Sequence, residues 1–574
     1  MSPRQQEIIF VNGPTLSRTG DEDSSKARSV LIRRQILDKK TKYRREEAIK
    51  RDQLIARRQS DGNHVERVYC SWCRRCNLEQ ALLGTGQLPP TTGAPCASNG
   101  QLILCETHQR LQNVRRISRD RGSQPTAIVS GRMDPFSPLD VAMGPQVDSL
   151  VHFALTAIWP AFRCSEYSAQ CYQAWMLQQS QNKLLVYSTL WAAAYHREVL
   201  RVSYGASDPL PETKEQLYYK GLVLKTLREH VAEYADETWR DSVIMCVLYL
   251  AVNDTGRKKI DRDPSPFVAP FVDLQSLSFY GSRDYHALHW GIIQDILRRL
   301  GGIHSVKLFG LGWLLSLADL MNAAHSLTKP QYPFVDLHGN ISKATAPSLA
   351  FPYINKQCPT PGIGFHDLYS LVPPIKSEVV RTFIHLGEYS AVIQWAQKIH
   401  LHPETTDQIA DTRNQIHHNL FGLPDDSNPV NDVLDLSGFN SPPDQMVEGH
   451  RLYLVCRLAA FLYAVHVTFP VPRSSALRAI IVPKLTPMLF LINRRICDAL
   501  LLWCATVAAI AADGMEEHDS LVHLASELCH DLQITEFSAL IMVVQRFAWV
   551  DNACRDGCHR LWDKVYKGSV RRDL

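Results

Sequence analysis

The chain has 574 residues, of which 45% are hydrophobic and 21% are charged. This length excludes one compact core of ordinary size, unless the core is an extended helical array, and the composition is that of a soluble globular protein. Residues 1–125 hold 23 Lys and Arg against 13 Asp and Glu, a charge of +10, so the remainder carries −6 of the formal net charge of +4. This asymmetry indicates a polyanion partner or an import signal, or else a solvated arm without a partner.

Residues 1–60 are predicted to form a basic head, partly helical and partly disordered. Residues 26–60 contain no Pro or Gly, and their apolar residues follow a rough helical stripe, which predicts a basic helix. A basic cluster of the nuclear-localisation type lies in this helix, at Lys39, Lys40, Lys42, Arg44 and Arg45. These residues are the candidates for nuclear import or for contact with nucleic acid, so DNA is a candidate partner.

Residues 61–125 form the second predicted region, which holds a metal-like spacing of cysteines. Two short knuckles would supply a Cys3His tetrahedral set of the kind that zinc accepts, made of Cys70, Cys73, Cys105 and His108. The additional thiols of Cys76 and Cys96 leave the ligand assignment open. The alternative is a group of reduced cysteines in a poorly ordered segment. Zinc is therefore the one cofactor candidate.

A segment rich in Pro, Gly and Ser around residues 117–140 predicts a boundary, so the third region is taken as 126–574. From Val147 onward apolar residues recur at helical spacing up to Pro160, which is predicted to end the helix. The next predicted stripe consists of Leu217, Gly221, Leu224 and Val231. We expect this stripe to be buried.

Further helices follow without convincing strands. Residues 243–252 are apolar nearly all round, and the segment from His289 ends in Gly301 and Gly302, a helix end that suits the left-handed conformation of glycine. The segments rich in Pro, Gly, Ser or acidic residues are expected to be surface excursions, at 326–375 and 425–444. Helices are expected again at about 376–400, 446–466 and 474–512. The predicted class is all-α, with irregular helices and no fixed repeat.

The end of the chain is the most apolar part. Residues 499–512 are apolar on every side, as a helix surrounded by helices should be, and they are too short to span a membrane. Two helical stripes follow, at 537–548 with Thr535 as the expected N-cap, and at 554–565. Cys554 and Cys558 share a helix face and are read as buried core thiols. No membrane partner is predicted.

A motif closes this region: Phe-x-Trp-Val-Asp-x-Ala-Cys-x-x-Gly-x-x-x-Leu-Trp, from Phe547 to Trp562. Together with the apolar Leu-Trp helix before it, the motif resembles the end of the fungal-specific transcription factor domain. Asp134-Pro-Phe136 resembles the start of that domain. The helix that ends at Gly301-Gly302 resembles another of its helices, with Leu300 where the family has arginine.

The resemblance implies an all-helical regulatory domain in a nuclear transcriptional regulator that has no catalytic activity, with other transcription-regulatory proteins as partners. The family's binuclear zinc cluster needs two halves of Cys-x2-Cys-x6-Cys, and this spacing does not occur here. Sequence-specific DNA binding is therefore not implied. The alternative is a helical scaffold or co-regulator without DNA binding of its own.

Catalysis is not predicted. The sequence has no Gly-x-Ser-x-Gly elbow, no phosphate-binding loop and no dinucleotide-binding glycine motif. Four histidines lie near one another in the sequence without a carboxylate or cysteine at ligand spacing, and they are expected at the surface or at helix ends: His400, His402, His417 and His418. An enzyme would need paired carboxylates or histidines in a deep pocket.

Overall fold

Eighteen α-helices and no β-strand make up the part of the chain that the structure describes, which confirms the predicted all-α class. The structure is a computed structural model, and it describes residues 147–570 except 164–165, 204–212, 254–261, 344, 357–359 and 438–441. All described residues belong to one compact unit. The predicted head and the cysteine segment, with their candidate residues, lie outside the described residues.

The N-terminal half of this unit is built on four helices, with α7 packed against α8 and α9, and α9 packed against α11. Its α-helices are α4 (Val147–Phe153), α5 (Trp159–Phe162), α6 (Tyr167–Cys171), α7 (Lys183–Ser203), α8 (Lys214–His230), α9 (Glu237–Asn253), α10 (Leu277–Tyr280) and α11 (Ala287–Arg299). Two π-helical turns, η1 (Ala154–Ile158) and η2 (Tyr172–Leu177), continue α4 and α6. Short 3-10 turns are η3 (Val231–Glu233), η4 (Leu274–Ser276) and η5 (Ile303–Ser305).

The C-terminal half is centred on α16 and α18, which pack against each other. Its α-helices are α12 (Leu311–Ser326), α13 (Pro347–Ala350), α14 (Ser377–Ala396), α15 (Pro403–Phe421), α16 (Pro443–Tyr463), α17 (Ser474–Phe490), α18 (Asp498–Ala511), α19 (His518–Asp531), α20 (Phe537–Val544) and α21 (Asp551–Val570). The π-helical turn η9 (Ala464–Thr468) extends α16, and the 3-10 turns are η6 (Pro352–Lys356), η7 (Ile363–Ser370) and η8 (Val430–Asp432).

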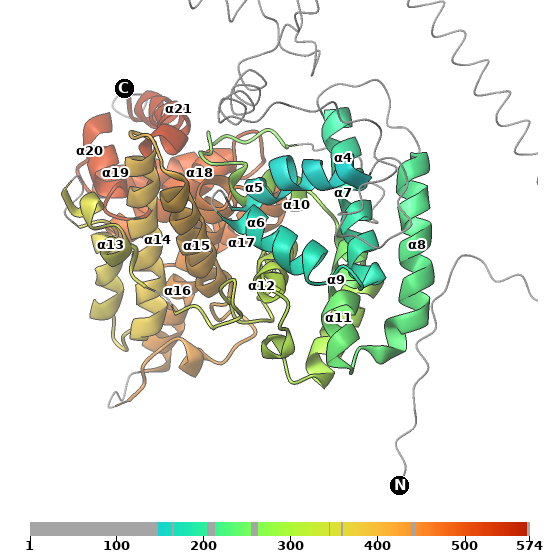
Figure 1. Cartoon of the computed structure of the whole chain (residues 1–574). Coiled ribbons are helices and arrows are strands. Elements are labelled where there is room, and N and C mark those ends of the chain that lie inside the picture. The colour runs from blue at the N-terminus through green and yellow to red at the C-terminus, as the bar shows by residue number, and fades with distance from the viewer. Residues whose placement is uncertain are drawn as a thin grey trace, which may run out of the picture. The chain divides into compact units, whose positions relative to one another are not determined.

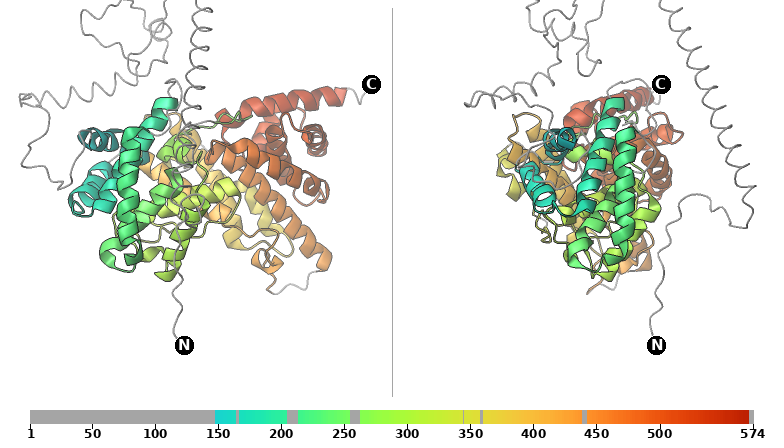
Figure 2. Two further views of the ribbon diagram at one scale, coloured as in Figure 1. Left: turned by 90° about the vertical axis from the view of Figure 1, so that its right-hand side faces the viewer. Right: turned by 45° about the vertical axis from the view of Figure 1, so that its right-hand side comes forward.

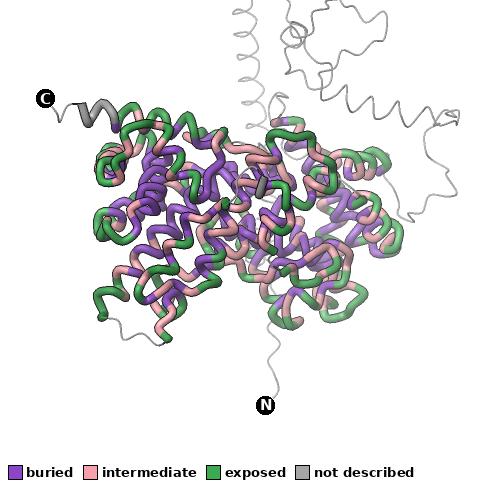
Figure 3. The backbone as a smooth tube through the Cα atoms, turned by 90° about the vertical axis from the view of Figure 1, so that its left-hand side faces the viewer, coloured by how far each residue is buried: buried purple, intermediate pink, exposed green. Residues whose placement is uncertain are grey.

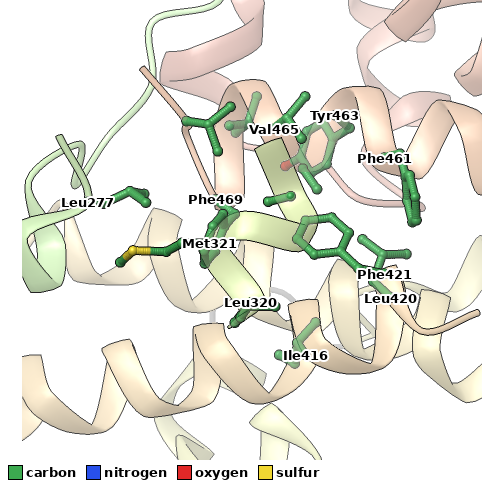
Figure 4. Close-up of a cluster of buried hydrophobic side chains, with 14 of the residues drawn as sticks. Leu277, Leu320, Met321, Ile416, Leu420, Phe421, Phe461, Tyr463, Val465 and Phe469 are labelled. Carbon is green, nitrogen blue, oxygen red and sulfur yellow. The ribbon is translucent and has the colours of Figure 1, made fainter. Parts of the chain in front are cut away.

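The two halves share one hydrophobic core. In Figure 1 the half coloured cyan to green lies to one side of α12 and the half coloured orange to red lies to the other, and the left view of Figure 2 separates them similarly. The buried tube runs through both halves in Figure 3. Figure 4 shows how side chains from α10, α12, α15, α16 and η9 converge where the halves meet, among them Leu277, Met321, Phe421, Phe461 and Phe469.

The long helix formed by α16 and η9, Pro443–Thr468, is apolar enough and long enough to cross a membrane by length and composition alone. Within the protein, however, 89% of its most apolar window is buried. It contacts α15, α17 and α18, and its tyrosines Tyr453 and Tyr463 are fully buried. A helix that is covered on all sides by other helices needs no polar face. We therefore describe it as the central core helix.

Several predicted elements are confirmed. All residues of α18 from Ala499 to Ala511 are buried, and so is nearly all of the segment 243–252 within α9. Helix α11 ends before Gly301 and Gly302, whose φ angles of 85° and 112° lie in the region that favours glycine.

The prediction of the buried face of α8 is wrong, because the predicted stripe is exposed. Leu217 and Leu224 are 52% and 40% exposed, whereas the buried residues of α8 are Gln216, Tyr219, Val223 and Leu227. Gln216 fixes this orientation because it closes a capping box with Thr213 and donates to the carbonyl of Ala194 on α7 at 3.2 Å. The helix thus buries an amide that is satisfied by hydrogen bonds.

Two predicted boundaries are also wrong. Pro160 does not end the first helix, because it lies in the first turn of α5, where a helix needs no amide donor. The residue before α20 is Glu536 rather than Thr535, and its side chain makes no capping hydrogen bond.

Candidate functional site

A small cavity, which offers about 60 Å³ to a sphere of the size of water, lies between η1, α5, α6, α7 and α9 of the N-terminal half and α12. We call it the aromatic cavity because seven of its eighteen lining residues are aromatic: Trp159, Phe162, Tyr167, Trp175, Tyr249, Tyr280 and Tyr285. Aliphatic side chains and small residues, including Ala193 and Ala318, complete the lining, and none of the described residues in it is charged.

Several rings of the wall meet edge to face. Trp159 and Trp175 have ring centroids 5.6 Å apart and planes at 89°, and Tyr167 meets Trp175 at 6.5 Å and 90°. Such T-shaped contacts are favourable for aromatic pairs. The Trp175 indole N–H donates to the carbonyl of Phe309 at 2.9 Å, so this ring is held in place.

Two hydroxyl groups of the lining have one polar neighbour each. The Tyr167 hydroxyl lies beside the Cys171 thiol, and the Thr189 hydroxyl lies beside the Tyr249 phenol. Both residues are almost completely buried, at 2% and 4% exposed. Burial raises the pKa of Tyr167 and Tyr249 well above the usual 10, so the phenols stay neutral. The cavity therefore offers neutral donors and acceptors without charge.

An ion pair joins the edge of this region to the C-terminal half. Arg163, which follows α5, donates from Nη1 to both carboxylate oxygens of Asp411 on α15, at 2.7 and 2.8 Å. Its guanidinium also lies over the Trp313 ring, 5.7 Å from the centroid. Arginine suits this position because it can pair with a carboxylate and stack on an aromatic ring at once. This contact fixes α5 against α15.

A buried polar layer lies where α15, η4 and η9 meet. Arg413 Nη2 and Asn414 Nδ2 both donate to Gln275 Oε1 at 2.7 Å, and Arg413 Nη1 donates to the carbonyl of Leu274 at 3.0 Å. Burial lowers the pKa of Arg413 to about 10. Gln275 is held at φ 55°, a left-handed conformation that is uncommon for residues other than glycine. These bonds cross between segments far apart in sequence and serve to fix the two halves together.

His417 belongs to the same layer, which corrects the prediction that it lies at the surface. It is fully buried, its Nδ1 lies 2.6 Å from the carbonyl of Arg413, and its Nε2 lies 2.8 Å from the Thr468 hydroxyl. The prediction holds for His400 and His402, which are exposed, while His418 contacts the Tyr332 carbonyl at 2.8 Å. Periodicity could not show that His417 faces inward, because its partner Thr468 comes from a distant segment.

The remaining predicted site residues are distributed as follows. The candidate zinc ligands Cys70, Cys73, Cys105 and His108, and the basic cluster from Lys39 to Arg45, lie outside the described residues. Cys554 and Cys558 are buried core thiols, as predicted, and burial raises the pKa of Cys558 to about 12. Within the described ranges no three His, Cys, Asp or Glu residues are arranged to hold a metal ion.

The sequence did not predict the aromatic cavity. Its wall is assembled from segments between residues 154 and 321, and no single segment carries a recognisable ligand motif. The one available signal is the density of aromatic residues between Trp159 and Trp175. No protein-family model matches the chain, and no curated protein or solved structure is significantly similar to it.

Proposed function

We propose that this chain is a transcriptional regulator that acts in the nucleus through its all-α body. The observation that supports this most is the packing of the family-like motif at the end of the chain. Phe547, Trp549 and Cys554 are buried. The Phe547 ring stacks on Trp503 of α18 with centroids 5.8 Å apart, and the Trp503 indole N–H donates to the carbonyl of Ala548 at 2.9 Å. The motif thus forms a packing centre with the Leu-Trp helix that accompanies it in the resemblance.

The division of charge supports the same proposal. The first 125 residues carry +10 and the rest of the chain −6, so a basic head is joined to a mildly acidic body. A basic head favours contact with DNA phosphates or recognition by the import machinery. The body supplies surfaces for other transcription-regulatory proteins.

Chromatin occupancy of the tagged full-length protein in its native cells tests the proposal. We expect discrete promoter peaks, and we expect them to weaken when residues 1–60 are deleted if the head contacts DNA. A matched variant, in which Lys39, Lys40, Lys42, Arg44 and Arg45 are replaced by glutamine, separates the charge of the cluster from the rest of the head. A full-length protein that stays outside the nucleus would contradict the proposal.

A second candidate is a helical scaffold or co-regulator that reaches promoters through other proteins. It is favoured by the missing Cys-x2-Cys-x6-Cys spacing, since the family's usual DNA-reading module is not available. This candidate predicts nuclear protein whose peaks persist after the head's basic cluster is neutralised. Binding of purified full-length protein to duplex DNA, with a steep dependence on salt, would count against it.

The proposed zinc set is tested by metal analysis of the purified full-length chain under reducing conditions. We expect about one zinc per chain, because four ligands complete one tetrahedral site. Cys105→Ser should lose the metal, and Cys246→Ser, which changes a buried thiol of α9, should retain it. Zinc content far below one per chain in the parent protein would remove the site.

A further inference from the structure

We propose that the outer face of α8 binds an acidic amphipathic helix of a partner protein. This face consists of exposed residues that recur at helical spacing on the side of α8 opposite the core: Lys214, Leu217, Gly221, Leu224, Lys225 and Arg228. The inference rests on the proposed function for the source of the partner, because it assigns one surface of the body to the proteins that a regulator contacts.

Helix α8 is covered on one side only. It packs against α7 and α9 and buries Tyr219 and Val223, and it lies at the outer edge of the N-terminal half in Figure 1. On the opposite side, Leu217 and Leu224 are 52% and 40% exposed, and the neighbouring Tyr218 is 49% exposed. Single exposed apolar residues are ordinary, whereas three within about two helical turns form a patch that a partner can cover.

The shape of the patch favours a helix as the partner. Gly221 lies four residues after Leu217 and three before Leu224, so the glycine stands between the two leucines on one face. Glycine weakens a helix, and a Cβ atom at this position would meet nothing within 4 Å, so no contact among the described residues requires it. Between two paired helices, such a notch receives a side chain of the facing helix and lets the backbones approach.

The charges of the face restrict the partner further. Lys214, Lys225 and Arg228 are exposed around the leucines, and no described carboxylate forms an ion pair with them. Glu229 is the one exposed carboxylate of α8, since Glu215 is half-buried and pairs with an arginine of α7. The face is thus positive on a body that carries −6 over residues 126–574. Carboxylates that flank the apolar residues of a partner helix would pair with these cations and fix its register.

Charge also disfavours two other occupants of the face. A second copy of α8, placed antiparallel across a two-fold axis at Gly221, would bring Lys214 of one copy next to Arg228 of the other, and contact between like charges is unfavourable. The basic head of residues 1–60 would meet the same repulsion. The acidic helix is therefore expected to belong to another protein.

Fluorescence anisotropy of a labelled synthetic peptide with the purified full-length protein tests the proposal. The probe is a helix of about four turns, with leucines at positions i, i+3, i+4 and i+7 and glutamates at the flanking positions. A control peptide carries lysines in place of the glutamates. We expect the acidic peptide to bind at least about 10-fold more tightly than the lysine peptide, and its affinity to fall as salt is raised.

A substitution in the notch locates the site. Gly221→Leu fills the space between the two leucines with a residue that favours a helix, so we expect binding to weaken about 10-fold without a loss of thermal stability. Gly291→Leu is the matched control, because Gly291 also lies within a helix and its Cβ atom would meet nothing within 4 Å. It should bind the acidic peptide as the parent does.

A charge reversal tests the same face without changing its shape, and it decides alone if Gly221→Leu does not fold. Replacement of Lys225 and Arg228 together by glutamate should weaken binding of the acidic peptide at least about 10-fold. The same change at Lys343 and Arg495, which are exposed on other elements, should reduce it much less.

The proposal is overturned if the acidic peptide does not bind the parent protein, if the lysine peptide binds equally, or if the notch and charge variants bind as the parent does. Binding to vesicles of phosphatidylserine and phosphatidylcholine in place of the peptide would assign the face to a membrane surface. Dimer formation that Gly221→Leu abolishes would assign it to a second copy. A protein that occupies promoters but does not bind the peptide removes only this inference, whereas one that binds the peptide but stays outside the nucleus removes only the proposed function.

Discussion

The body contains two aromatic clusters that differ in how they fill space. Around Trp503, the rings of Phe365 and Phe547 meet at centroid distances of 5.2 to 5.8 Å, and none of the three lines the aromatic cavity. Around Trp175, rings meet at similar distances but enclose the aromatic cavity. The number of aromatic residues therefore does not decide whether a cluster is filled.

The difference lies in the backbone. Beside the Trp503 cluster, a Cβ atom on Gly364 would lie 2.5 Å from the Phe547 ring, and a Cβ atom on Gly387 would lie 2.5 Å from Gly362 Cα. These glycines let the main chain approach the rings and its own neighbours closely. No glycine is among the residues that line the aromatic cavity. Close backbone approach therefore accompanies the cluster around Trp503, whereas the lining of the aromatic cavity contains no glycine that would allow it.

The largest effect is expected where the backbone approach is closest. Gly387→Ala places a methyl group against the main chain of Gly362, which cannot rotate away, so we expect a loss of about 3 kcal/mol. Urea denaturation followed by tryptophan fluorescence measures it. Gly291→Ala is the matched control, because it also lies within a helix but meets nothing within 4 Å. Equal midpoints for the two variants would contradict the account of the sealed cluster.

The polar layer between the two clusters should respond next. Gln275→Ala removes the oxygen that accepts from both Arg413 and Asn414, and it leaves a buried cation with fewer partners. We expect a loss of about 2 kcal/mol. Gln331→Ala removes an exposed amide that pairs with Gln294, and its unfolding midpoint should stay close to that of the parent. A Gln275→Ala protein as stable as Gln331→Ala would show that the layer does not hold the halves together.

Acid should weaken the same layer through His417. Burial lowers the pKa of His196, His417 and His466 to about 3. Below the ordinary histidine pKa of 6.5, the unfolded chain therefore binds more protons than the folded protein does. Stability is therefore fully present above pH 6.5 and falls toward pH 3, by about 1.4 kcal/mol per histidine and pH unit. The carboxyl of Asp319, whose pKa is raised to about 6, acts in the opposite direction between pH 6 and its ordinary 3.8.

The measurement compares urea midpoints at pH 7 and pH 5.5 for the parent and for His417→Gln. Between pH 7 and pH 5.5, the stability of the variant should fall less than that of the parent, by the contribution of one histidine. The opposing contribution of Asp319 is common to both proteins. An identical decline in both proteins would mean that His417 takes up a proton in the folded state.

The smallest effect concerns the surface of the N-terminal half. Gly221→Ala on α8 meets nothing within 4 Å, and alanine favours a helix over glycine, so we expect a gain of about 0.5–1 kcal/mol. A loss of stability in thermal unfolding would mean that the predicted stripe, rather than the observed face, is buried. The exposed side chain of Leu224 supplies a control, since Leu224→Gln should shift the midpoint little.

The sequence predicted burial where a helix is apolar on every face. Residues 499–511 are such a helix, and they are buried. The end of α11 could be predicted at Gly301 and Gly302, because glycine readily adopts positive φ angles. The sequence did not predict which face of α8 is buried. Leu217 is more apolar than Gln216, and only the fold shows that the Gln216 amide is buried with a hydrogen bond to the Ala194 carbonyl. His417 and the aromatic cavity were missed for the same reason, since distant segments supply their surroundings.

The order in which the chain is made bears on the core helix α16. Its buried surface is covered by α18, and the sealed cluster beside it needs Phe365, Trp503 and Phe547 together. Segments in the middle of the chain also bond to segments that are synthesised later. The amide of Val268 donates to the carbonyl of Ala553 at 3.0 Å, and the amide of Gly364 donates to the carbonyl of Arg546 at 2.8 Å. During synthesis, α16 therefore leaves the ribosome before the helices that cover it, and this apolar segment is a natural client for chaperones until the last helix arrives.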